Sequence, residues 1–143
     1  MMIGERTAED IKMNIGAAFP EARKEEMDIR GRDMLTGLPK NLTITTAQAA
    51  EAMNQSVTRI VDQVKKVLEE TPPELSADIM DRGIILTGGG AMLYGLDELI
   101  RRETEIPTAL ADDPLSCVAL GCGKALDTFA KFDGKATNLK MRH

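Results

Sequence analysis

Apolar side chains near the start of the chain recur at the spacing of one face of an α-helix. The pattern comprises Ala8, Ile11 and Ile15. Thr7 is in position to cap this helix, with Asp10 as a weaker stand-in for the glutamate of a capping box. Gly16 is in position to end it. The sequence therefore predicts an amphipathic helix over residues 7–16.

A second and longer helical pattern occupies the middle of the chain. Its apolar positions are Met53, Val57, Ile60, Val61, Val64, Val67 and Leu68. They fall at intervals of three and four residues and form one apolar stripe. Thr45 or Thr46 is expected to cap either one long helix or a closely spaced pair of helices. The helical pattern should stop before Pro72, because a proline disfavours helix in the residue that precedes it.

Two segments between these helices, 27–30 and 42–45, alternate apolar and polar residues, as β-strands do. Gly31, Gly37 and Pro39 mark turns between them, and residues 33–35 are predicted as a further strand or a turn. The first half of the chain therefore reads as a helix, a small antiparallel sheet and a helix, which suits an inserted α+β subdomain.

The second half alternates helices and strands. A short helix over 74–80 precedes a strand over 84–86, and a strand over 107–110 precedes a helix from 117 to about 130, capped by Ser116. Between the two strands lies a helix with apolar positions at Leu93, Leu96, Leu99 and Ile100. The polar, basic tail from Lys131 onward is expected to be frayed. This order predicts an α/β fold.

Composition narrows the function classes. The chain has 143 residues, 43% of them hydrophobic, which suffices for one domain or two small subdomains. A net charge of −5 argues against general nucleic-acid binding. No apolar run approaches the roughly 18 residues of a membrane span, and no signal peptide is recognised. Cys117 and Cys122 lie in an apolar run and are expected to be reduced thiols of a cytosolic protein.

Three consecutive glycines, Gly88, Gly89 and Gly90, follow the strand predicted over 84–86. Glycines at the end of a strand let a ligand approach the backbone with no Cβ in the way. The segment is therefore a candidate binding edge for a flat or phosphorylated ligand. Because it lacks the lysine of a P-loop, the glycines alone do not identify that ligand. The alternative is a tight strand-to-helix connection with a purely structural role.

Charged residues on the first predicted helix form the other candidate binding feature. Glu5, Glu9 and Lys12 occupy one helix face, where a carboxylate and an ammonium group could bind ribose hydroxyls and the edge of a base. The alternative is a solvated face with pairing along the helix. The sole histidine, His143, lies at the end of the chain, which argues against histidine triads and histidine metal sites within the fold.

Several strings of residues resemble, in order and spacing, the bacterial actin homologue MreB and its paralogues such as Mbl and MreBH. They are IGERTAEDIK at 3–12, IRGRD at 29–33, TPPEL at 71–75 and DRGIILTGGGA at 81–91, followed by DPL at 113–115 and GCGKAL at 121–126. The resemblance covers nearly the whole chain up to Asp127.

The resemblance implies the actin-like ATPase fold of the ribonuclease-H type, in which two domains enclose a nucleotide cleft. This chain resembles only the C-terminal part, an incomplete second domain. Residues 1–54 would form most of its small inserted subdomain, and residues 55–130 the last segment of its larger subdomain. Residues 131–143 would be a frayed tail.

The resemblance also implies that this chain binds the adenosine part of ATP. The family's site residues map onto Thr7, Ala8, Glu9, Asp10, Lys12, Gly88, Gly89, Gly90 and Ala91. Glu9 and Lys12 match the positions that contact base and ribose, and the glycines match the turn beneath the adenine. The family's phosphate-binding hairpins, catalytic acid and magnesium site precede the part that this chain resembles. No catalytic or metal-binding residue is therefore assigned here, and little or no hydrolysis is expected from this chain alone.

The function that the resemblance implies is that of a filament-forming bacterial actin that determines rod shape by organising cell-wall elongation. Such a protein is cytoplasmic and works at the inner face of the cell membrane. Its partners would be further copies of itself and the elongation machinery, with membrane contact only through parts outside this chain. The doubled methionine at the start indicates a start codon placed before an internal segment, or an ordinary short N-terminus.

Two other functions remain open at this point. One is a segment of another actin-fold ATPase, such as a sugar kinase or an Hsp70-like chaperone. The other is an interaction module that keeps a filament contact surface and binds no nucleotide. The sequence upstream of Met1 would discriminate the first from the cytoskeletal family, because these families differ in their phosphate-binding hairpins and inserted subdomains. The second would co-pellet with full-length filaments without binding a nucleotide of its own.

Overall fold

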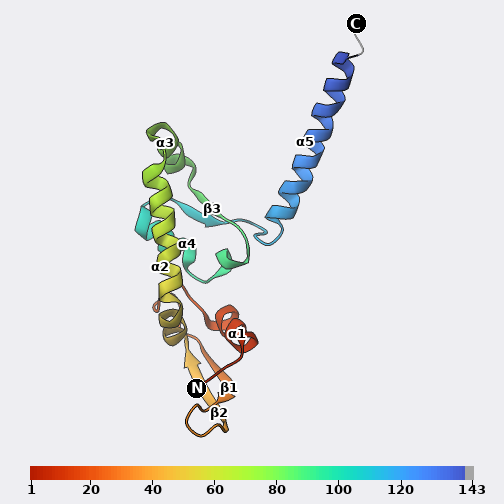
Figure 1. Cartoon of the computed structure of the whole chain (residues 1–143). Coiled ribbons are helices and arrows are strands. Elements are labelled where there is room, and N and C mark those ends of the chain that lie inside the picture. Colours follow the sequence, from red (N-terminus) through yellow and green to blue (C-terminus); the bar gives the residue numbers. More distant parts are fainter. Residues whose placement is uncertain (141–143) are drawn as a thin grey trace.

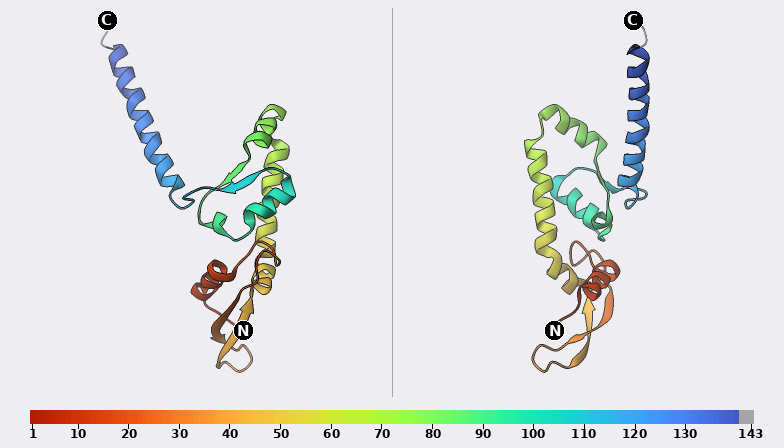
Figure 2. Two further views of the ribbon diagram at one scale, coloured as in Figure 1. Left: turned by 180° about the vertical axis from the view of Figure 1, so that it is seen from behind. Right: turned by 45° about the vertical axis from the view of Figure 1, so that its right-hand side comes forward.

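The computed structural model describes the backbone of residues 1–140 and the side chains of residues 1–129. A long helix, α2 (Thr46–Glu70), runs along the molecule, with a β-hairpin at one end and the short helix α3 (Pro73–Arg82) at the other (Figure 1). The last helix, α5 (Cys117–Lys140), projects away from the remaining elements in every view (Figure 2).

The hairpin pairs β1 (Glu26–Arg32) with β2 (Pro39–Thr45) in antiparallel register, with Ile29 opposite Leu42. This confirms the predicted strand pair and extends both strands. Helix α1 (Glu5–Ile15) packs on the hairpin together with the start of α2. Their shared core consists of Ile11, Ile15, Ile29 and Ala49.

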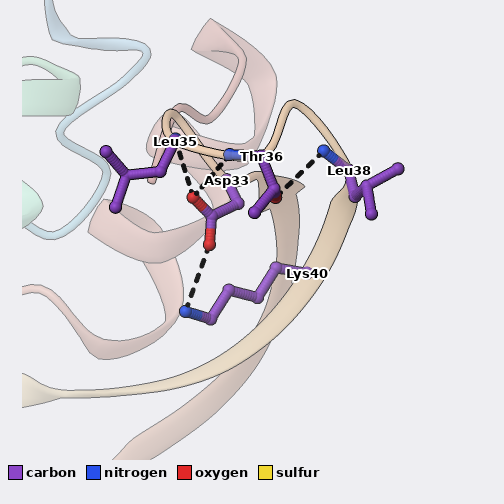
Figure 3. Close-up of polar contacts among 5 residues, drawn as sticks. All are labelled: Asp33, Leu35, Thr36, Leu38 and Lys40. Atoms are coloured by element: carbon purple, nitrogen blue, oxygen red, sulfur yellow. Dashed lines mark hydrogen bonds and ion pairs between the residues drawn. The ribbon is translucent and has the colours of Figure 1, made fainter.

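The hairpin loop is a turn organised by Asp33, and no strand forms at 33–35 (Figure 3). One carboxylate oxygen of Asp33 accepts the N–H of Leu35 at 2.8 Å, and the other lies 3.4 Å from the ammonium group of Lys40. The backbone donation from Leu35, assisted by Thr36 and Lys40, lowers the pKa of the Asp33 carboxyl. The loop holds Leu35 almost wholly in solvent, at 96% exposure.

Helix α2 is one continuous helix, which decides between the two arrangements that the sequence left open. It begins with a complete capping box: the Thr45 hydroxyl accepts the N–H of Gln48, and the Gln48 side chain accepts the N–H of Thr45. The expected subdomain boundary at 54/55 falls inside this helix. Met53, next to that boundary, packs against both core clusters of the chain.

The second core cluster lies between α2 and α4 (Leu96–Thr104). Its buried members are Ala18, Val57, Val61, Leu96 and Ile100. Beside it, β3 (Ile84–Leu86) pairs in parallel with β4 (Thr108–Leu110), and α4 lies in the connection between the two strands. This βαβ order confirms the predicted α/β alternation.

The predicted start of α4 and the predicted end of α5 are wrong. Helix α4 begins at Leu96, because the preceding Gly95 has a left-handed conformation with φ +76°, so Leu93 lies outside the helix. Helix α5 continues to Lys140, beyond the end predicted near residue 130, and fraying of residues 131–143 stays a prediction. A single glycine at 134 costs only about 1 kcal/mol in a helix and is not enough to end it. The remaining tail residues, 141–143, lie outside the described part of the chain.

In the described part of the chain, no helix combines the length and the hydropathy that crossing a membrane requires. Helix α5 nevertheless carries exposed apolar side chains. Val118, Leu126 and Phe129 are all exposed and lie at helical spacing along one side of it.

Candidate functional site

The first glycine of the segment, Gly88, is required by its backbone conformation. Gly88 has φ +86°, a value that favours glycine, and its N–H donates to the carbonyl of Pro114 at 2.8 Å. The chain then forms a single 3-10 turn, η1 (Gly89–Met92). The glycines therefore open a short 3-10 turn that is tied to the loop after β4, instead of leading directly into the next α-helix.

Gly90 lies in open space. A Cβ added at Gly90 would meet no atom within 4 Å, and one added at Gly89 would make only an ordinary contact with Leu115, at 3.4 Å. Neither residue has the positive φ that Gly88 has. The fold itself therefore does not require glycine at position 90, and the bare backbone there is free to receive a ligand.

On the other side of the site, α1 begins two residues earlier than predicted. Its N-cap is Gly4, and Thr7 already lies inside the first helical turn, so neither Thr7 nor Asp10 takes part in a cap. Glu5 provides negative charge in this first turn, which the helix dipole favours. The exposed side chains of Glu9 and Lys12 lie one turn apart on this helix.

A cleft of about 490 Å³ separates α1 from the glycine turn. It brings together two motifs that are far apart in the sequence. Its lining residues are Glu9, Lys12, Met13, Gly16, Arg23, Gly89, Gly90, Met92, Leu93, Tyr94 and Leu115. The predicted pairing of the Glu9/Lys12 face with the glycines is therefore present in the structure.

The other residues implied by the family resemblance lie near this cleft but do not line it. Ala8 faces an apolar groove of about 620 Å³, shared with Leu42 and Ile44 of the hairpin. Ala91 lines a different hollow, together with Arg101 of α4. Thr7, Asp10 and Gly88 are absent from the cleft lining. Whether any of them binds a ligand stays a prediction.

Nothing in the sequence indicates two further lining residues, Arg23 and Tyr94. The guanidinium carbon of Arg23 lies 5.0 Å from the centroid of the Tyr94 ring. These residues come from the loop before β1 and the loop before α4, and no motif or spacing connects those loops. Only the folded chain places them side by side.

The chemistry of the cleft is that of a binding site. The Glu9 carboxylate accepts hydrogen bonds, and the Lys12 ammonium donates them. The backbone at Gly90 leaves room for a flat group, while Met92 and Leu93 supply apolar surface. Within the described residues, no group of three or more His, Cys, Asp or Glu side chains is arranged to hold a metal ion. The arrangement suits a heterocycle that carries hydroxyl groups.

Comparisons with known proteins agree with one another. Residues 1–134 match the model of the MreB/Mbl protein family. The chain is 54% identical to the cell shape-determining protein Mbl of Bacillus subtilis over 131 residues, which cover 92% of this chain and 39% of that protein. It is 48% identical to the cell shape-determining protein MreB of Escherichia coli K12 over 126 residues, or 88% of this chain and 36% of that protein.

Two crystal structures of MreB5 of Spiroplasma citri, one bound to ADP and one to AMPPNP, superpose on the chain with TM-scores of 0.88 at 36% identity. They match 94% and 95% of this chain, and 41% of the MreB5 chain in each case. The chain thus spans about two fifths of the length of the relatives that it matches.

Proposed function

The chain belongs to the MreB/Mbl family and has part of its actin-like fold, and on this premise we propose that it forms the adenosine side of the nucleotide cleft in a filament-forming bacterial actin. The proposed role of the whole protein is to determine rod cell shape by organising cell-wall elongation.

The observation that carries the proposal is the cleft between α1 and the glycine turn. Glu9 and Lys12 offer an acceptor and a donor to the hydroxyls of a ribose and the edge of a base. Across from them, a flat adenine ring would rest against the Gly89–Gly90 backbone, where Gly90 has no neighbour within 4 Å of a Cβ position. A polar wall opposite a bare one fits a nucleoside better than a compact anion.

The nucleotide-bound relatives support the same proposal. Both Spiroplasma citri structures contain an adenine nucleotide, and nearly all of this chain matches a part of each of them. By analogy, we assign ATP as the ligand of this cleft. The phosphate groups and a magnesium ion would be held by a segment that the longer relatives possess outside the matched two fifths.

Membership of the family supports a proposal for the cellular role. We propose that the protein assembles with further copies of itself into filaments in the cytoplasm, at the inner face of the membrane, together with the cell-wall elongation machinery. Contact with the membrane would be made by parts outside this chain. Hydrolysis of ATP needs a cradle for the β- and γ-phosphates, a metal ion and a positioned water, so we expect the chain alone to release no phosphate above background.

The binding proposal is tested by NMR titration of the chain with ATP and with adenosine, read at the backbone amides of Gly89 and Gly90. We expect both ligands to shift these resonances at millimolar concentration, because half a site binds weakly. Gly90→Ala should weaken binding with little change in stability, since its Cβ displaces no protein atom. Glu9→Gln and Lys12→Gln should also weaken it.

Gly121→Ala is the matched control. A Cβ at Gly121 also meets nothing within 4 Å, but this residue lies on α5, outside the cleft lining. It should leave the titration unchanged. The assignment would be contradicted if millimolar adenosine did not shift the Gly89 and Gly90 resonances. It would also be contradicted if Gly90→Ala left the titration unchanged.

A further inference from the structure

The two walls of the cleft are joined by the loop that follows α1. Within this loop, Ala17 forms a parallel β-bridge with Tyr94, and the N–H of Ala18 donates to the Tyr94 carbonyl at 2.8 Å. The loops approach so closely that a Cβ on Gly95 would lie 3.1 Å from both Phe19 and Ala22. The position of α1 relative to the glycine turn therefore depends on how this loop is held.

Arg23 holds both sides of this junction. Its Nη2 donates to the carbonyl of Gly16 at 2.9 Å, and its guanidinium carbon lies 5.0 Å from the centroid of the Tyr94 ring. Gly16 is the C-cap of α1, and its own N–H donates to the carbonyls of Ile11 and Lys12. Arg23 is thus connected through one residue to the turn that carries Lys12.

Arg23 is half-buried, which distinguishes it from an ordinary surface arginine. Its Nε is buried and has no hydrogen-bond partner among the described residues, and no carboxylate there forms an ion pair with it. Burying a donor without a partner is unfavourable. The side chain is nevertheless held there by a ring and a carbonyl, which fixes its plane instead of merely neutralising its charge.

We propose that Arg23 is a positioning residue for the candidate nucleotide cleft. It clamps the C-terminal end of α1 to the loop at Tyr94 and thereby sets the separation of Lys12 from the Gly89–Gly90 backbone. The inference rests on the proposed function, because it concerns the same cleft, but the clamp itself is a property that can be measured without nucleotide.

The first measurement is amide hydrogen exchange at Ala18, whose N–H bridges the two loops. Arg23→Gln should raise its exchange rate about tenfold or more relative to amides in the middle of α2, because a charged hydrogen bond and a cation–π contact are lost together. Tyr94→Leu should have the same effect. Tyr94→Phe, which keeps the ring, should leave the exchange at Ala18 slow.

Arg102→Gln is the matched control. Arg102 also stacks over an aromatic ring, at 4.6 Å from the centroid of Phe19, but it does not line the cleft. It should leave exchange at Ala18 unchanged. The clamp is disproved if Arg23→Gln leaves Ala18 protected, or if Arg102→Gln exposes it to the same degree.

The second measurement is ATP affinity by the titration described above. We expect Arg23→Gln and Tyr94→Leu to weaken it severalfold. Unchanged affinity in a variant whose Ala18 exchange is raised would overturn the positioning role. If the unsubstituted chain shows no shift with ATP, the proposed function and the positioning role both fail, while exchange at Ala18 still decides whether the clamp exists.

Discussion

The backbone N–H of Ala18 donates to the carbonyl of Tyr94 at 2.8 Å, joining the loop after α1 to the loop before α4. Ala18 is buried in the core between α2 and α4, whereas α1 packs on the hairpin. This contact therefore links the half of the molecule that carries Glu9 and Lys12 with the half that carries the glycines. The cleft exists because these halves meet here.

Gly83 should tolerate substitution poorly. It has φ +79°, and a Cβ there would lie 2.5 Å from the carbonyl oxygen of Pro107, which accepts the N–H of Ile84. Gly83→Ala is expected to lower the free energy of unfolding by about 2 kcal/mol or more. Urea denaturation followed by circular dichroism measures this change.

Gly37 provides the comparison for Gly83. It has a similar φ of +73°, but a Cβ there would meet nothing within 4 Å. Gly37→Ala should therefore cost about 1 kcal/mol, from backbone strain alone. Equal costs at the two positions would show that the approach of Pro107 is not the constraint.

The capping box of α2 should make a measurable contribution to stability. Thr45→Ala removes the hydroxyl that accepts the N–H of Gln48, and we expect a loss of about 1 kcal/mol in urea denaturation. Thr45→Ser keeps the hydroxyl and should cost only a small part of this. If the serine variant is as unstable as the alanine variant, the effect of Thr45 is one of packing.

The stability of the hairpin loop should depend on pH in the acid range. Backbone donation from Leu35 lowers the pKa of Asp33 from its ordinary value of 3.8 in the folded chain. A carboxyl with a lowered pKa stabilises the fold above its unfolded pKa, and this contribution is lost as pH falls through the folded pKa. The Leu35 amide resonance should therefore titrate with a midpoint below 3.8.

Asp33→Asn is the control for this titration. The amide oxygen can still accept the N–H of Leu35, but it does not ionise in this range. The Leu35 resonance should then be independent of pH between 2 and 5, to about the precision of the measurement. A midpoint at or above the ordinary value in the unsubstituted chain would contradict the lowered pKa.

Exposed apolar surface should cause the chain to associate. Among the described residues β3 pairs with β4 alone, and Ile85 is exposed, as are Val118 and Leu126 on α5. Light scattering under reducing conditions should show a mass that rises with concentration. Leu126→Lys should reduce this association, and a monomer at all concentrations would rule it out.

The sequence was sufficient for the local structure. Helical spacing identified α2, alternation identified both strands of the hairpin, and the pair Thr45–Gln48 completed a cap that needs only neighbouring residues. It was less accurate at element ends. The start of α4 depends on the left-handed Gly95, and that conformation is fixed by the loop lying against it.

Some residues of the candidate site were identifiable from the sequence, and others were not. Glu9, Lys12 and the glycines were recognisable as motifs, because helix periodicity and consecutive glycines are properties of short segments. Arg23 and Tyr94 were not, since their contact depends on a bridge between loops far apart in the sequence. The sequence by itself thus determined most of the secondary structure, the family and the two motifs of the candidate site. Only the tertiary structure decided which residues share the cleft, because that depends on long-range packing.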